Sequence, residues 1–295
     1  RTQTQCEQVL PNLDFKGNPL MEFCKLERLD PYFAIHLVAY FISNLKCCIA
    51  LMSGSSGSLK TTITAHIKRV VDPRGENTNE DQVSSIPIKI DDLILQFYNN
   101  YLVVFENVSY ITNEISDVLC KATTGSMFSK RKHYENLEEV MIKILRKIVV
   151  NGISPNFDRD DLIQRTIVYH TTIPSEEDRL TDEDVEEKFR TLLPDLLGQI
   201  FFTLQKVLNT YDSVKGEIKS KSRMASFLVY GEVISRSLGN EPNDYVKWLN
   251  SKTETAITEA NETSPLIPYL NSQNIDDKKY KKWLIQFQDF QHKLK

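Results

Sequence analysis

The pattern of hydrophobic and polar positions changes along the chain near residue 175. Before that point, short continuous apolar runs alternate with segments in which apolar residues recur at helical spacing. After Pro174 the helical spacing continues alone, beginning at Thr181-Asp182-Glu183-Asp184, which has the form of a capping box. The pattern therefore predicts an α/β region followed by a helical region.

The continuous apolar runs predict four strands. An apolar run without polar alternation indicates a strand that is covered on both faces, as in a parallel sheet. The predicted strands span residues 45–52, 101–107, 147–152 and 166–170. We therefore expect an α/β fold that is built on a parallel sheet.

Helical spacing predicts further helices between and after these strands, at residues 62–71, 91–98, 114–122, 181–208 and 222–238. Asp30 and Pro31 have the residue types preferred at a helix N-cap and at the first helical position. The stretch 32–42 that follows them is apolar, but it is only about half as long as a membrane span. We expect a buried helix there and no membrane partner. Because the chain opens on polar residues rather than a signal peptide, we expect an intracellular, cytoplasmic protein.

Length and composition suggest more than one domain. The chain has 295 residues, of which 41% are hydrophobic, enough for a large core domain and a smaller helical one. We expect a linker or the end of a preceding domain at 1–32, the core domain at 33–175, and the helical region at 176–295. The sequence has no initiating methionine, which favours a further segment before residue 1.

The net charge of −4 argues against a wholly basic nucleic-acid coat, but the charges are segregated. Basic residues gather at 130–147 and 278–282, and acidic residues gather at 176–187, where a solvated helix start is the simplest interpretation. The cysteines show no C-x-x-C spacing, which indicates reduced thiols and argues against a zinc site. They are Cys6, Cys24, Cys47, Cys48 and Cys120.

A glycine- and serine-rich loop follows the first predicted strand and leads into a helix. Its residues are Gly54, Ser55, Ser56, Gly57, Ser58, Leu59, Lys60, Thr61 and Thr62. A strand, a loop of this kind and a helix form the context of a P-loop, in which backbone N–H groups hold phosphate. Lys60 would then reach the β- and γ-phosphates, and the Thr61 hydroxyl would bind Mg²⁺. The alternative is an ordinary turn that precedes Lys-Thr.

Leu59 departs from the P-loop pattern G-x-x-x-x-G-K-[ST], in which glycine precedes the lysine. A leucine at that position is strained by roughly 1–2 kcal/mol if its φ is positive. In a helical conformation it costs little.

Three polar residues follow or precede predicted strands and are candidates for catalysis. Glu106 ends a hydrophobic strand as a Walker B acid does and would bind Mg²⁺; otherwise it is a solvated acid. Asn151 ends the next strand and could orient a water molecule, or it could simply form an Asn-Gly turn. Arg165, just before the last strand, is placed like an arginine finger, although a lone arginine is more often a surface or ion-pair residue.

A basic run follows the turn at Gly125. The alternation from there to Tyr134 predicts the start of a β-hairpin. Lys130, Arg131 and Lys132 would contact nucleic-acid phosphates on this hairpin, whereas the alternative is a solvated basic loop.

Taken in order, these motifs resemble the ATPase domain of superfamily 3-like AAA+ helicases from phages, plasmids and other mobile elements, which are often fused to or paired with a primase. The resemblance covers about residues 33–265 and includes Arg223-Met224-x-x-Phe227-x-x-x-Gly231-Glu232 in the helical region. It implies a three-layer AAA+ core with a C-terminal helical lid, ATP and Mg²⁺ as cofactors, and a hexameric ring acting on single-stranded or forked DNA. It makes Lys60 and Thr61 the phosphate and Mg²⁺ ligands, Glu106 the Walker B acid, Asn151 sensor 1, and Arg165 a finger acting on the neighbouring subunit. It also places Lys130 and Arg131 in a hairpin that lines the central channel.

Two other functions stay open. A nucleotide-binding DNA-binding or regulatory module that hydrolyses ATP weakly or not at all is favoured by Leu59 and by Asn107, which stands where many relatives carry a second acid. A protein-remodelling AAA+ machine would need aromatic pore residues, and the basic run at 130–132 argues for phosphate instead.

Overall fold

The computed structural model describes residues 6–75, 78–131, 139–152, 159–175, 177, 180–219 and 222–262. The chain divides into two compact units, residues 1–256 and 257–295, and every strand belongs to the first unit.

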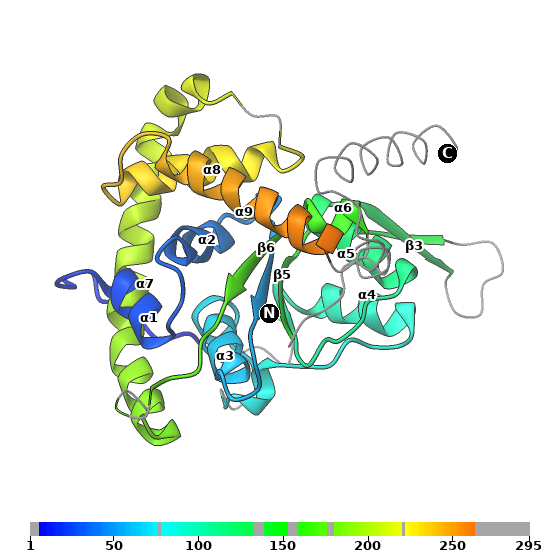
Figure 1. Ribbon diagram of the computed structural model, residues 1–295, viewed down its shortest axis with the longest axis horizontal. Coiled ribbons are helices and arrows are strands. Elements are labelled where there is room, and N and C mark those ends of the chain that lie inside the picture. Colours follow the sequence, from blue (N-terminus) through cyan, green and yellow to red (C-terminus); the bar gives the residue numbers. More distant parts are fainter. Residues whose placement is uncertain are drawn as a thin grey trace, which may run out of the picture. The chain divides into compact units, whose positions relative to one another are not determined.

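A four-stranded parallel sheet lies at the centre of the first unit (Figure 1). Its strands are β1 (Ile49–Ser53), β2 (Leu102–Phe105), β5 (Lys147–Gly152) and β6 (Thr166–His170), in the spatial order β2-β5-β1-β6. Each neighbouring pair is parallel, which confirms the prediction from the apolar runs. Ser84 adds a single parallel bridge to Phe105 at the β2 edge.

Helices cover both faces of this sheet and create two cores. Ala50 and Met52 of β1 pack into one core, whereas Ile49 and Leu51 pack into the other. The first core lies under α2 (Phe33–Tyr40), α3 (Lys60–Val71), α7 (Asp182–Val214) and α8 (Ala225–Ser237); the second lies under α4 (Ile90–Asn99) and α5 (Asn113–Thr124). In Figure 1, α7 and α4 accordingly lie on opposite sides of the strands. The protein is thus a three-layer α/β structure with a buried parallel sheet.

Helix α1 (Pro19–Leu26) was not predicted from the sequence, which suggested only a linker or the end of a preceding domain at 1–32. The side chain of Asn18 caps it by accepting from the Met21 N–H, and Pro19 occupies the first turn. Leu20 and Phe23 are fully buried in the first core. The Leu20 N–H also donates to Gln199 Oε1 of α7 at 2.7 Å, so α1 is an integral part of the layer that α7 forms.

The beginning of α2 differs slightly from the predicted helix. The assigned helix begins at Phe33, with Tyr32 at its N-cap, rather than at Pro31. Asp30 nevertheless caps the preceding turn, because its Oδ1 accepts from the Tyr32 N–H at 3.0 Å. The predicted capping box of α7 is present, between Thr181 and Asp184.

The predicted β-hairpin is confirmed. Strand β3 (Met127–Arg131) pairs antiparallel with β4 (Glu139–Lys143) in a separate two-stranded sheet just before β5 in the chain. Lys132 lies outside the described residues, as does the basic cluster at 278–282. The remaining elements are α6 (Asp160–Ile163), α9 (Asp244–Glu262) and two 3₁₀ turns, η1 (Glu80–Gln82) and η2 (Lys215–Glu217).

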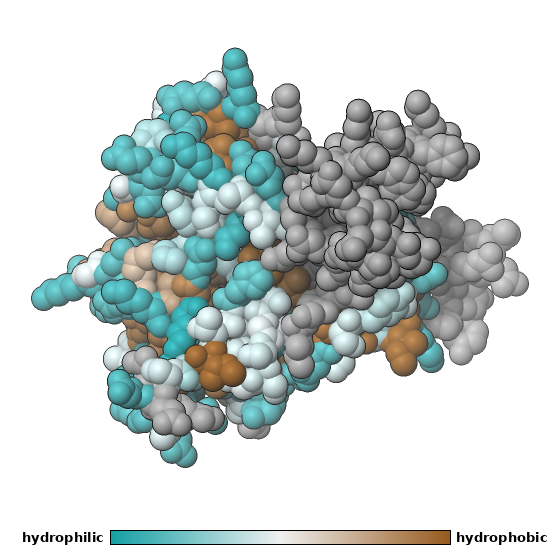
Figure 2. All heavy atoms as spheres, viewed as in Figure 1, coloured by the Kyte–Doolittle hydropathy of each residue, from teal (hydrophilic) through white to brown (hydrophobic). Residues whose placement is uncertain are grey.

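Within the described residues, no helix has the length and apolar character needed to cross a membrane. Figure 2 shows a face that is mostly hydrophilic over the coloured residues, with small separate hydrophobic patches.

All five cysteines are free thiols, and all except Cys6 are buried. Cys47 and Cys48 come just before β1 rather than on it.

Candidate functional site

The predicted loop and the polar ends of two other strands meet at one edge of the sheet. The strands are parallel, so their carboxyl ends lie on the same side. In the register, Met52 of β1 pairs with Asn151 of β5, and Phe105 of β2 pairs with Val150 of β5. Asn151 therefore comes between the start of the loop and Glu106.

The loop after β1 requires glycine at two positions. A Cβ on Gly54 would lie 2.4 Å from Thr171 Oγ1 and 2.5 Å from the Thr171 carbonyl oxygen. Gly57 has φ +81°, which side chains disfavour. Buried Ser58 fixes the loop further, because its Oγ donates to the Ser55 carbonyl at 2.9 Å and lies 2.9 Å from Thr171 Oγ1. Thr171, which follows β6, thus holds the loop in place, although the sequence alone gave no reason to select it.

Leu59 adopts the left-handed conformation, with φ 56° and ψ 22°, at the N-cap of α3. The strain of roughly 1–2 kcal/mol expected for a leucine there therefore applies. Its carbonyl still accepts the first helical hydrogen bond, from the Ile63 N–H at 3.0 Å. The loop thus keeps a glycine-like backbone at a position occupied by leucine.

The ammonium group of Lys60 folds back over the loop. Its Nζ donates to the carbonyl oxygens of Gly54 at 2.9 Å and Ser55 at 2.7 Å, and to Ser58 Oγ at 3.3 Å. Partial burial lowers the Lys60 pKa from its usual value. These neutral oxygen acceptors are groups that anionic phosphate oxygens could replace, since charge-assisted hydrogen bonds are the stronger ones.

Thr61 and Glu106 are brought together. The Thr61 hydroxyl donates to Glu106 Oε2 at 3.5 Å, and Glu106 is half-buried at the end of β2. A hydroxyl and a carboxylate are oxygen ligands of the type that Mg²⁺ binds. The described residues contain no group of three or more His, Cys, Asp or Glu side chains able to hold a metal. A Mg²⁺ site here fits the usual pattern of one or two protein ligands completed by phosphate and water.

Asn151 links the turn after β2 to helix α3. It is 1% exposed, and its Oδ1 accepts from the Asn107 N–H at 2.9 Å while its Nδ2 donates to Thr64 Oγ1 at 3.1 Å. Asn107 has a positive φ of 53°, a conformation that asparagine tolerates. Asn151 is therefore a buried strand residue that holds the chain next to Glu106, not an exposed turn. Thr64, one helical turn after Thr61, is a second member of the site that the sequence reasoning missed.

Arg165 lies at the other end of the strands, where β1 begins. Its carbonyl accepts from the Ile49 N–H at 2.7 Å at the amino end of β1, about 15 Å from the loop by the rise of a five-residue strand. The side chain is 16% exposed and pairs with the carboxylate of Asp161 at 2.5 Å. Arg223, from the segment before α8, pairs with the same carboxylate oxygen. The structure thus separates Arg165 from Lys60, Thr61 and Glu106 of its own chain.

Lys130 and Arg131 lie at the end of β3, opposite Val140 and Glu139 of β4 in the backbone register. This hairpin forms a two-stranded sheet of its own, separate from the central sheet that ends at the loop and Glu106.

A family model for the replication protein of actinomycete integrative conjugative elements (AICE_RepA) matches residues 21–238, and the chain belongs to this family. This confirms the expected connection to the replication of a mobile element. Comparison with curated protein sequences finds no match.

Similar solved structures include the C-terminal region of NrS-1, at 17% identity and a TM-score of 0.44, covering 81% of this chain and 70% of that one. The SCCmec type IV Cch active helicase is 12% identical with a TM-score of 0.42, covering 85% of this chain and 53% of that one. A putative ATPase from Cytophaga hutchinsonii is 10% identical with a TM-score of 0.41, covering 80% and 86%. Similarities at this level are too low to assign a function.

Proposed function

We propose that the chain binds ATP and Mg²⁺ on the loop 54–62 and hydrolyses the ATP, as the motor of a protein that replicates mobile-element DNA. The observation that carries this proposal is the meeting of Lys60, Thr61 and Glu106 at the carboxyl edge of a parallel sheet, from segments 45 residues apart. The ammonium group of Lys60, the hydroxyl of Thr61 and the carboxylate of Glu106 lie at a loop that requires glycine at two positions. These are the groups that bind a triphosphate and its metal ion.

Each residue has a distinct role in this proposal. The backbone N–H groups of the loop and the start of α3 bind phosphate oxygens, and Lys60 exchanges the carbonyls of Gly54 and Ser55 for phosphate. Thr61 and Glu106 hold Mg²⁺, which when bound neutralises charge on the phosphates. Asn151 keeps the Glu106 turn in position and, near the carboxyl end of β5, would orient water.

Arg165 supports an oligomeric arrangement. It lies about a strand length from its own loop, so it can assist hydrolysis only in the site of a neighbouring subunit. To do so it would exchange Asp161 for a phosphate. We therefore propose a homo-oligomer, with a hexameric ring as its specific form, in which Arg165 of one subunit completes the next subunit's site.

The hairpin β3–β4 supplies the proposed contact with DNA. Lys130, Arg131 and Lys132 bind the phosphates of single-stranded or forked DNA, and closure of the subunit interface moves the hairpin along the strand. Membership of a replication-protein family supports DNA as the partner. We also propose a primase as a partner in replication, either as a further domain or as a separate protein. The helices after residue 181 would act as the lid of the ATPase core.

A second candidate is a module that binds ATP but turns it over slowly or not at all. The left-handed Leu59 favours it, because leucine stands where the loop conformation suits glycine. Asn107 favours it too, since it provides no second carboxylate beside Glu106.

Replacement of Lys60 by alanine tests the nucleotide site. Lys60→Ala should abolish tight binding of a fluorescent ATP analogue with Mg²⁺, because the loop loses the cation that pairs with the phosphates. Lys121→Ala, at an exposed position of α5, is the matched control and should bind as the wild type does. Equal binding by Lys60→Ala and Lys121→Ala would show that the loop is not the nucleotide site.

A further inference from the structure

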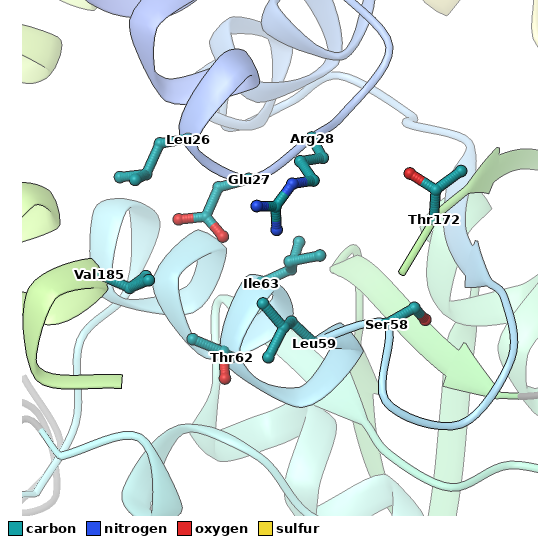
Figure 3. A pocket seen from close by; sticks show the side chains of 9 residues that line it. All are labelled: Leu26, Glu27, Arg28, Ser58, Leu59, Thr62, Ile63, Thr172 and Val185. Carbon is teal, nitrogen blue, oxygen red and sulfur yellow. The ribbon is translucent and has the colours of Figure 1, made fainter. Parts of the chain in front are cut away.

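A small pocket lies beside the loop, where four distant segments of the chain converge (Figure 3). Leu26 is the last residue of α1 and Arg28 follows that helix, Leu59 comes from the loop, and Ile63 from α3. Thr172 follows β6 and Val185 belongs to α7. In Figure 3 the Arg28 side chain reaches toward Leu59 and Ile63, with Leu26 and Val185 on one side and Thr172 on the other.

The lining of this pocket has the character of a site for a flat heteroaromatic ring. Leu26, Leu59, Ile63 and Val185 give it apolar walls, and polar groups come from Glu27, Arg28, Ser58, Thr62 and Thr172. Leu59 also immediately precedes Lys60. A nucleotide whose phosphates lie on the loop therefore has its sugar and base within reach of this pocket.

The pocket is nevertheless almost closed. Its volume is about 10 Å³, which is room for about one water molecule and far less than a nucleobase needs. Leu59 is partly buried and packs against the first core, so its side chain takes up space that a glycine would leave open. Its left-handed backbone, with φ 56°, is an unfavourable conformation kept beside the proposed phosphate site.

We propose that Leu59 closes the nucleobase pocket, so that the wild-type chain recognises a nucleoside triphosphate through its phosphates and discriminates little between bases. This inference rests on the proposed nucleotide site at Lys60. We assign the effect to the Leu59 side chain and not to its left-handed backbone. The side chain acts by occupying the pocket.

Calorimetric titration with three probes tests this role. MgATP, MgGTP and magnesium tripolyphosphate, which has no base, are titrated into the wild type, Leu59→Gly and Leu26→Ala. The wild type should bind all three with dissociation constants within about tenfold of one another. Leu59→Gly should bind MgATP about tenfold more tightly and leave tripolyphosphate unchanged.

Leu26→Ala widens the same pocket from α1 without altering the loop, so it should show the same selective gain for the nucleotides. Leu59→Ala, whose melting temperature is checked first, replaces Leu59→Gly if the glycine variant does not fold. An equal gain for tripolyphosphate would overturn the inference, because Leu59 would then act on the phosphate loop. A selective loss of MgATP affinity would overturn it as well, because Leu59 would then support the base.

The failure of the proposed nucleotide site has a different signature. In that case Lys60→Ala would bind tripolyphosphate as tightly as the wild type does, whatever the result for Leu59.

Discussion

The hydroxyl of Thr61 lies 3.5 Å from a carboxylate oxygen of Glu106, although 45 residues separate them in the sequence. The sheet brings them together, because β1 and β2 flank β5 and all three strands end at the same edge. Asn151, at the end of β5, holds the Glu106 turn through the Asn107 N–H and holds α3 through Thr64. The relative position of the hydroxyl and the carboxylate is therefore fixed by buried groups.

Arg165 provides a test of assembly. If it acts on a neighbouring subunit, Arg165→Ala should bind ATP almost normally and hydrolyse it more slowly, by up to about 10³-fold. Mixing Arg165→Ala with Lys60→Ala should restore part of the turnover, because some interfaces then combine an intact Lys60 with an intact Arg165. Full activity of Arg165→Ala alone, or no recovery in any mixture, would exclude a role in a neighbouring site.

The basic hairpin provides a test of DNA binding. Replacing Lys130, Arg131 and Lys132 by alanine should weaken binding to a fluorescent oligothymidylate and lower the slope of log affinity against log salt by about 0.7 per lost contact. The control variant neutralises three exposed lysines elsewhere, Lys25, Lys89 and Lys121, and changes the net charge equally. If both triple variants show the same slope as the wild type, the hairpin does not bind phosphate.

The sequence predicted the sheet and the cluster at its edge well, for a physical reason. Strands buried on both faces are uniformly apolar, so 101–107, 147–152 and 166–170 were recognisable without any structure. Once they are parallel, Lys60, Glu106 and Asn151 must share an edge. The backbone conformation of Leu59 could not be predicted, because the sequence does not determine φ at a single loop residue. In the structure it is left-handed.

The groups that hold the site were not predictable in the same way. Thr171 packs so closely against Gly54 that a Cβ there would clash with it, and Thr64 accepts a hydrogen bond from Asn151. Neither contact leaves a pattern in the sequence. The short helix α1 carried the signals Asn18 and Pro19, but eight residues give too little periodicity to support a prediction. The ion pair between Arg165 and Asp161 could have been predicted, because the two residues stand at i and i+4.

A buried ionic cluster joins helix α3 to α1 and α7. His66 of α3 lies 2.7 Å from Glu27 Oε1 and 3.4 Å from Glu186 Oε2, and Arg69 makes a bidentate pair with Glu186. Burial lowers the His66 pKa, but Glu27 and Glu186 outweigh it, so the pKa is raised above 6.5. Hydrogen bonds from His66 and Arg69 lower the pKa of Glu186, which also pairs with Arg190.

Stability should therefore fall as the pH rises above neutrality. A raised folded-state pKa means that the His66 contribution is complete below about pH 6.5 and is lost as the pH passes the folded value. Glu186 contributes above its ordinary pKa of 4.5, so it is not lost in this range. The loss is at most about 1.4 kcal/mol per pH unit. Urea unfolding at several pH values should show this decline in the wild type but not in His66→Gln, and parallel curves would contradict it.

The central claim, that this site hydrolyses ATP through Glu106, is tested most directly by steady-state turnover of Glu106→Gln, with MgATP affinity measured on the same preparation. The amide keeps the shape of the side chain but removes its charge, so turnover should fall on the order of 10²-fold or more while ATP still binds. Glu187→Gln, an exposed position on α7, should match the wild type. Turnover by Glu106→Gln equal to that of the wild type, or a wild type without turnover both with and without single-stranded DNA, would contradict the claim.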